Sequence, residues 1–248
     1  MRILPTPLKV LTYNIHHGRG LDRVLDLERI AAKIDESGAD LVGLQEVDKH
    51  WSARSDWADQ PAWFAQRLGM HVAYAANLDL PPLNPGEPRR QYGTAILSRF
   101  PIRDFHNTLL PIYRGHEQRG LLEATIDVRG NDLRFADTHL TSYNKAERLG
   151  QAKRVVKLLG ASEQPTVLVG DLNARPRALE ITTLTAHWRD TWTEVGDGPG
   201  YTIKANNPTA RIDYVLHSDD VLARSAEVIT TYGSDHLPVF AELSLLRA

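Results

Sequence analysis

The sequence contains no cysteine, which excludes disulfide bonds, zinc–thiolate sites and thiol nucleophiles. It also lacks a long apolar run, since no segment approaches the roughly 20 apolar residues that a membrane-spanning helix needs. The first ten residues contain Pro5 and Pro7 and lack the apolar stretch of a secretory signal peptide. We therefore expect a soluble, cytoplasmic protein.

The sequence has no excess of charge of either sign, with 29 basic and 31 acidic side chains and a net charge of −2. This balance argues against a strongly basic nucleic-acid-binding surface, although it leaves a local basic groove open. The 248 residues, 42% of them hydrophobic, are enough to bury a sizeable core. No segment has the composition of an interdomain linker, so we expect residues 1–248 to form a single domain.

Short apolar runs rich in β-branched residues predict buried strands. These strands cover residues 10–15, 41–47, 71–75, 94–98, 122–128, 133–139, 166–172, 212–217, 226–231 and 239–245. Apolar residues at helical spacing predict helices at 26–37, 60–68, 144–159 and 178–184, the first three closed by Gly38, Gly69 and Gly160. Residues 79–91 and 195–209, rich in proline, glycine and asparagine, are predicted loops. The order of these elements indicates an α/β or α+β protein, with mixed sheets and helices outside them.

Polar residues recur at the ends of the predicted strands, where rigid scaffolds often carry functional groups. They occur in Tyr-Asn-Ile at 13–15, Gln-Glu-Val at 45–47, Thr-His-Leu at 138–140, Gly-Asp-Leu-Asn at 170–173, Arg-Ile-Asp-Tyr at 211–214 and Ser-Asp-His at 234–236. Any one of these residues, taken alone, is explained by a turn or a helix cap. Together they supply oxygen ligands suited to Mg²⁺ or Mn²⁺ and donors for phosphoryl oxygens. The set therefore points to metal-assisted cleavage of a phosphate ester.

These six motifs, in this order from residue 12 to residue 238, resemble the endonuclease/exonuclease/phosphatase superfamily. That superfamily includes exonuclease III-like repair nucleases, DNase I, deadenylases, inositol polyphosphate 5-phosphatases and neutral sphingomyelinases. The resemblance implies a four-layer α/β sandwich in which two packed mixed β-sheets are flanked by helices. It also implies a phosphoesterase that depends on a divalent metal, Mg²⁺ or Mn²⁺, and attacks the ester with water.

The resemblance implies a role for each motif residue. Glu46 would be the principal metal ligand, with Asn14 contributing directly or through water. Asp171 would position or deprotonate the attacking water, and Asn173 would orient that water or hold a phosphate oxygen. His139 would donate a hydrogen bond to a phosphate oxygen.

The last motif is expected to form a pair in which Asp235 hydrogen-bonds His236 and fixes its tautomer. His236 would then contact the phosphoryl group as an acid, a base or an electrostatic stabiliser. Asp213 would lie near the metal or support His139. The expected metal-binding residues are Asn14, Glu46, Asp213 and Asp235.

Two further positions bear on the site. Many repair nucleases have an acidic residue two positions after the first asparagine, but His16 stands there, which argues against a second metal site that depends on that carboxylate. Arg119 lies in a Glu-Gln-Arg-Gly segment, and both a contact with the substrate phosphate and a structural ion pair are open for it.

Two enzymatic interpretations compete for the substrate. A phosphodiesterase or phosphatase that acts on a small or lipid-linked phosphate ester is favoured, because the net charge gives little help to nucleic-acid binding. A DNA or RNA nuclease of the same superfamily is the alternative. A non-catalytic binding protein on this fold is disfavoured because Glu46, Asp171 and His236 are all present. The oligomeric state is left open.

Overall fold

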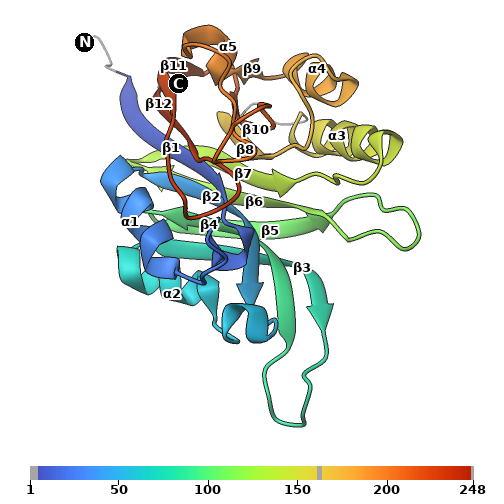
Figure 1. Cartoon of the computed structure of the whole chain (residues 1–248). Helices are drawn as coiled ribbons and strands as arrows, with labels where there is room; N and C mark the ends of the chain where they lie inside the picture. Colours follow the sequence, from blue (N-terminus) through green and yellow to red (C-terminus); the bar gives the residue numbers. More distant parts are fainter. Residues whose placement is uncertain (1–4, 161–163, 247–248) are drawn as a thin grey trace.

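The strands form two six-stranded mixed sheets in the computed structural model, which describes residues 5–160 and 164–246. The first sheet has the order β11-β12-β1-β2-β4-β3 and the second β5-β6-β7-β8-β10-β9 (Figure 1). Each sheet has one parallel pair, β1–β2 or β7–β8. The strands of the first sheet are β1 (Thr6–Asn14), β2 (Leu41–Lys49), β3 (His71–Leu80), β4 (Arg90–Ser98), β11 (Val221–Val228) and β12 (Val239–Leu245). Those of the second are β5 (Ile102–Leu109), β6 (Gly120–Val128), β7 (Asn131–His139), β8 (Thr166–Asp171), β9 (Arg189–Asp190) and β10 (Asp213–His217).

Helices cover the outer faces of both sheets, so the expected four-layer α/β sandwich is confirmed. They are α1 (Leu27–Ser37), α2 (Gln60–Leu68), α3 (Lys145–Leu159), α4 (Leu179–Thr185) and α5 (Thr191–Val195), with short 3-10 turns η1 (His16–Gly18) and η2 (Ala53–Ser55). In Figure 1, α1 and α2 lie on one side of the molecule and α3 and α4 on the other. Separate apolar clusters fill the space under α1 and α2, between the sheets, and under α3 and α4.

The two-residue period of β1 decides which of its side chains face the second sheet. Leu8 and Val10 pack in the cluster between the sheets, whereas Leu11 and Tyr13 pack under the helices. By the same alternation Asn14, the last residue of the strand, faces the second sheet. The strand thereby carries a polar side chain from the core to the edge where the two sheets meet.

The two sheets approach each other closely at Gly43 of β2. A Cβ atom there would lie 2.4 Å from Cγ2 of Val169 on β8, so only glycine fits without a shift. Beside this contact, Gln45 donates a 2.7 Å hydrogen bond to Asp137 of β7, and both side chains are buried. Burial raises the pKa of Asp137 well above its ordinary range. The interface between the sheets therefore contains a hydrogen-bonded polar pair within an apolar layer.

Most of the predicted elements are present, and side-chain hydrogen bonds cap two of the predicted helices. Asp26 accepts a hydrogen bond from the backbone of the first turn of α1, and Gly38 ends that helix with a φ of 63°. Asn144 caps α3 in the same way.

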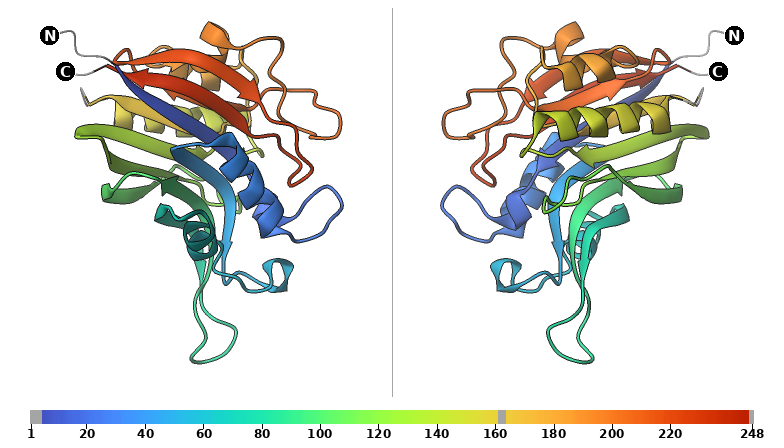
Figure 2. Two further views of the ribbon diagram at one scale, coloured as in Figure 1. Left: turned by 90° about the vertical axis from the view of Figure 1, so that its left-hand side faces the viewer. Right: turned by 90° about the vertical axis from the view of Figure 1, so that its right-hand side faces the viewer.

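Several predictions need correction. The strands β5 and β9 and the helix α5 were not predicted; β5 is an edge strand with mostly exposed residues and so has no apolar run, and β9 has only two residues. The strand predicted at 226–231 begins five residues earlier, at Val221, and ends at Val228. Finally, β3 and β4 extend into the predicted loop at 79–91 by pairing Leu80 with Arg90. Their connection projects from the body of the molecule in both views of Figure 2.

Candidate active site

The predicted site residues meet at one edge of the two sheets. Asn14 ends β1, His139 ends β7, Asp171 ends β8 and Asp213 begins β10. The strand register places His139 and Asp213 directly opposite Asp171, one on each neighbouring strand. The site is therefore built on strand ends, which hold side chains more rigidly than loops do.

Asn14 connects the two sheets. Its Nδ2 donates hydrogen bonds to Oε1 of Glu46 and to Oδ2 of Asp171, both at 3.1 Å, and the residue is only 1% exposed. Its Oδ1 accepts a hydrogen bond from the backbone N–H of His16. Asn14 thus fixes the positions of two carboxylates that come from different sheets.

Glu46 sits at an irregularity in β2, where the pairing with β4 shifts register between Leu44 and Val47. Its φ of 60° lies in the left-handed region, which a β-bulge can impose on one residue. In a regular strand Gln45 and Glu46 would point to opposite faces, whereas the bulge redirects Glu46. Both side chains can therefore point inward: Gln45 bonds Asp137 of the facing sheet, and Glu46 meets Asn14 at the site.

The position of Asp171 depends on the glycine before it. Gly170 has a φ of 147°, and a Cβ atom there would lie 1.9 Å from the carbonyl oxygen of Thr138 on β7. Burial and the neighbouring carboxylate of Asp213 raise the pKa of Asp171 to about 7. The backbone N–H of Asn173 donates to Oδ1 of Asp171 at 2.9 Å. A carboxylate with this pKa is suited to accept a proton near neutral pH.

His236 is paired with Asp213. Its Nδ1 lies 3.0 Å and 3.2 Å from the two carboxylate oxygens of Asp213, and its Nε2 lies 3.6 Å from Oδ2 of Asp171. Burial disfavours the imidazolium, but the charges of Asp213 and Asp171 outweigh it and raise the pKa of His236 to about 10. The hydroxyl of Thr202 also donates to Asp213. At neutral pH, His236 is therefore a buried cation beside Asp171.

The expected hydrogen bond between Asp235 and His236 was wrong. The chain bends over residues 232–235, whereas His236 bridges to Ile203 and its ring meets Asp213, so the two neighbouring side chains have different surroundings. Asp235 instead lies 3.8 Å from His16, with 45% of its side chain exposed, and Ser234 donates to it. Asp213 was expected near the metal or behind His139, yet it takes the place assigned to Asp235.

His139 is oriented by Arg119. Nη1 of Arg119 donates to Nδ1 of His139 at 2.8 Å and also lies 2.9 Å from the carboxylate of Glu117. Because Nδ1 accepts this bond, the ring proton is on Nε2, which faces Oδ2 of Asp171 at 3.3 Å. Burial and the charge of Arg119 hold the pKa of His139 well below its ordinary range. The arrangement makes His139 a neutral donor, and the substrate contact predicted for Arg119 stays a prediction.

Asn173 closes the site beside His139. It follows Asp171 by two residues, and its φ of 48° turns the chain back toward β7. Its Nδ2 donates to the carbonyl of Leu140 at 2.9 Å and lies 3.1 Å from Nε2 of His139. A polar residue that tolerates the left-handed region is required here, and asparagine meets both needs.

The profile of the endonuclease/exonuclease/phosphatase family matches residues 11–236, which include every residue of this site. The chain belongs to this family. The family consists of hydrolases that act on phosphate esters and generally use divalent metals. The family membership that the six motifs indicated is therefore confirmed.

Relatives and solved structures agree with this assignment. The uncharacterized protein YbhP of Escherichia coli is 27% identical over 252 residues, which cover 96% of both chains. A family structure from Beutenbergia cavernae is 27% identical with a TM-score of 0.84, and covers 98% of this chain and 72% of its own. A mannosyl-6-phosphatase of Bacteroides thetaiotaomicron shares the fold, with 19% identity, a TM-score of 0.77 and coverage of 95% and 99%.

The donor chemistry of the site fits a divalent cation. Among residues 5–160 and 164–246, two groups of side chains bring their ligand atoms within 4.8 Å of one another: Asp171, Asp213 and His236, and His16, His17 and Glu46. In the first group a charged His236 already balances the two carboxylates, so a cation there would compete with that proton. Glu46, with Asn14 beside it, belongs to the second region. The metal roles predicted for Asp213 and Asp235 remain predictions.

Residues that the motif analysis overlooked complete the site. Thr202 was not singled out, and no ligand role was assigned to His16 or His17. The adjacent histidines directly after Asn14 were a usable signal in the sequence. The contact of Thr202 with Asp213 had no local signal, because 11 residues separate them.

Proposed function

We propose that this protein is a divalent-metal-dependent phosphodiesterase that hydrolyses a small or lipid-linked phosphate ester by attack of water. The observation that supports this most directly is the contrast between two neighbouring groups. Asp171 has a pKa raised to about 7, while His236, 3.6 Å away, has a pKa raised to about 10. Both pKa values are raised, so near neutral pH Asp171 can accept a proton while His236 keeps its own, which suits the two groups to separate roles as base and cationic donor.

In the proposed mechanism Asp171 accepts a proton from the attacking water as the oxygen of that water bonds to phosphorus. The P–O bond to the leaving group breaks, and the departing oxygen takes up a proton from solvent. His236, protonated and held by Asp213, donates a hydrogen bond to the phosphoryl oxygens as their charge develops. His139 donates from Nε2 to a second oxygen, which frees Asp171 from that contact. Mg²⁺ or Mn²⁺ held by Glu46 and Asn14 would supply further positive charge to the phosphoryl group. We also propose that residues 1–248 act as one catalytic domain, since the site takes residues from both sheets.

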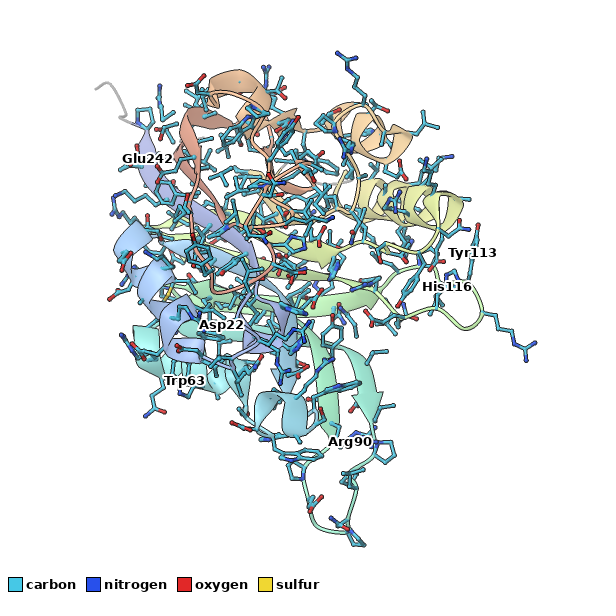
Figure 3. All side chains as sticks on the ribbon, viewed as in Figure 1. Asp22, Trp63, Arg90, Tyr113, His116 and Glu242 are labelled. Carbon is cyan, nitrogen blue, oxygen red and sulfur yellow. The ribbon has the colours of Figure 1, made fainter. Side chains whose placement is uncertain are left out.

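A cavity of about 640 Å³ beside Asn173 bears on the substrate. It is lined by Lys145, Arg175 and Arg177 among others, and these three residues are exposed. It opens near the start of α3, close to the β5–β6 loop that carries Tyr113 and His116 (Figure 3). A cationic cavity next to the site suits a substrate with a second negative charge, such as a phosphorylated head group.

A nuclease of the same family is the second candidate, because the same three cations could follow a nucleic-acid backbone. The net charge of −2 supports a nucleic-acid substrate less than it supports a small phosphate ester.

One panel of substrates tests both candidates. The metal-free protein is assayed with added Mg²⁺ or Mn²⁺ on bis-p-nitrophenyl phosphate, phospholipids, single- and double-stranded DNA, and RNA. We expect metal-restored turnover of the small diester and loss of that turnover in Asp171→Asn. Faster cleavage of DNA or RNA than of any small ester contradicts the proposed substrate class. Turnover without a metal, or in Asp171→Asn, contradicts the mechanism.

A further inference from the structure

The segment that follows β1 forms a strained turn beside Glu46. His16 and His17 both have a φ of 46°, and Glu46 has a φ of 60°. Side-chain-bearing residues seldom adopt the left-handed region, and such strain concentrates at ligand-binding and catalytic positions. Here three strained residues from two separate segments converge, with a ligand atom of each within 4.8 Å of the others.

Hydrogen bonding prepares the ring of His16 for coordination. Its Nδ1 lies 3.2 Å from the carbonyl oxygen of Arg19, so Nδ1 carries the proton and Nε2 keeps its lone pair. Metal-binding histidines usually donate their second ring N–H in this way, because the bond fixes the tautomer and the ring orientation. The ring centroids of His16 and His17 lie 4.4 Å apart, so the second imidazole is beside the first.

Charges of both signs surround the three side chains. Arg54 and Arg19 place positive charge near His17. Arg54 itself is bound by both carboxylate oxygens of Asp48, at 2.7 Å and 2.9 Å, which offsets its positive charge. The carboxylate of Asp235 lies 3.8 Å from His16 and adds negative charge at the same place.

We propose that His16, His17 and Glu46 together bind a first-row transition cation, such as Mn²⁺ or Zn²⁺, in preference to Mg²⁺. Two imidazole nitrogens and one carboxylate are ligands that such cations accept, whereas Mg²⁺ favours oxygen. Ligand atoms about 2.1 Å from one ion are at most about 4.2 Å apart, so the three side chains need to close by only a few tenths of an ångström. The inference rests on the proposed function in one respect, because Glu46 is also the ligand proposed for the catalytic metal.

Asparagine variants test the proposal with little added strain, because asparagine tolerates the left-handed region. The test variants are His16→Asn and His17→Asn. His50→Asn is the matched control: His50 has a φ of 52°, its Nδ1 is 2.9 Å from the carbonyl oxygen of Trp57, and a carboxylate of Asp59 lies 3.7 Å from its Nε2. Circular dichroism establishes that each variant is folded.

Two measurements on metal-free protein follow, neither of which depends on turnover. Titration calorimetry with MnCl₂, ZnCl₂ and MgCl₂ gives the affinities, and pulsed electron paramagnetic resonance of the Mn²⁺-loaded protein detects nitrogen bound to Mn²⁺. We expect nitrogen coupling in the wild type and in His50→Asn, and weaker coupling in each test variant. Mn²⁺ and Zn²⁺ affinity should fall by about 10–100-fold in the test variants, and Mg²⁺ affinity by less.

An oxygen-only environment for Mn²⁺ in the wild type overturns the proposal, and this result needs no variant to fold. An equal loss of Mn²⁺ and Mg²⁺ affinity in the test variants also overturns it. Failure of the proposed function gives a different pattern, in which Mn²⁺ binds with nitrogen coupling yet no phosphate ester is hydrolysed with any metal.

Discussion

Replacing Asp213 by asparagine tests the charge arrangement on which the proposed mechanism depends. Asp213 and Asp171 together raise the pKa of His236 from 6.5 to about 10 against the opposing effect of burial. One pKa unit corresponds to about 1.4 kcal/mol. Asp213 is the largest favourable contribution, so removing its charge should lower the pKa of His236 by at least about one unit, even with Asp171 present.

The assay is the pH dependence of kcat for a phosphodiester such as bis-p-nitrophenyl phosphate. Activity that needs protonated His236 should decline at high pH in the wild type and at lower pH in Asp213→Asn. Loss of a well-placed cationic donor commonly costs about 3–4 kcal/mol, or roughly 10²–10³ in rate, so kcat above the new pKa should fall by that order. Nitrogen NMR of labelled histidine can follow the imidazole of His236 directly.

Stability should follow the same titration. Since the pKa of His236 is raised on folding, its pairing stabilises the protein fully below about pH 6.5, and this stabilisation is lost as the pH rises toward about 10. The free energy of unfolding should therefore fall more in Asp213→Asn at pH 6 than at pH 10.

Asp235→Asn is the matched control for Asp213→Asn. It removes a carboxylate from the residue next to His236, but that side chain is 45% exposed and lies toward His16. Its pH profile should stay close to the wild type. A larger shift in Asp235→Asn than in Asp213→Asn would refute the pairing and restore the arrangement expected from the sequence.

Three further predictions concern the structure around the site. Gly43→Ala should destabilise the protein by about 1–3 kcal/mol in urea unfolding, because its Cβ would lie 2.4 Å from a carbon of the facing sheet. Gly150 lies in α3, and a Cβ atom there would have no neighbouring atom within 4 Å, so Gly150→Ala should stabilise the protein by up to about 1 kcal/mol. Burial raises the pKa of Asp137, so ionisation of this carboxyl at pH 8 disfavours the folded state. Asp137→Asn removes that cost, so it should change the free energy of unfolding more favourably at pH 8 than at pH 4. An equal change at both pH values contradicts this. Arg119→Met should lower kcat with little change in fold, because His139 loses the donor that fixes its tautomer, and unchanged kcat would remove Arg119 from the mechanism.

Local signals in the sequence were sufficient for much of the fold. Apolar runs marked the inner strands, and Asp26, Gly38 and Asn144 marked helix ends where the caps are found. These features depend on residues close together in the chain, so spacing reveals them. The edge strand β5 was missed for the same reason, because its residues are mostly exposed and carry no apolar pattern.

The sequence alone also identified the family and most of the polar residues that meet at the site, since the motifs retain their order and identity. Only the tertiary structure decided how those residues pair. His236 bonds Asp213, 23 residues away, rather than its neighbour Asp235, because strand register and side-chain direction set the contact. A bulge in β2 and a strained turn after β1 bring Glu46 and His16 together, although 30 positions separate them. Such pairings arise from packing between segments, which no local pattern encodes.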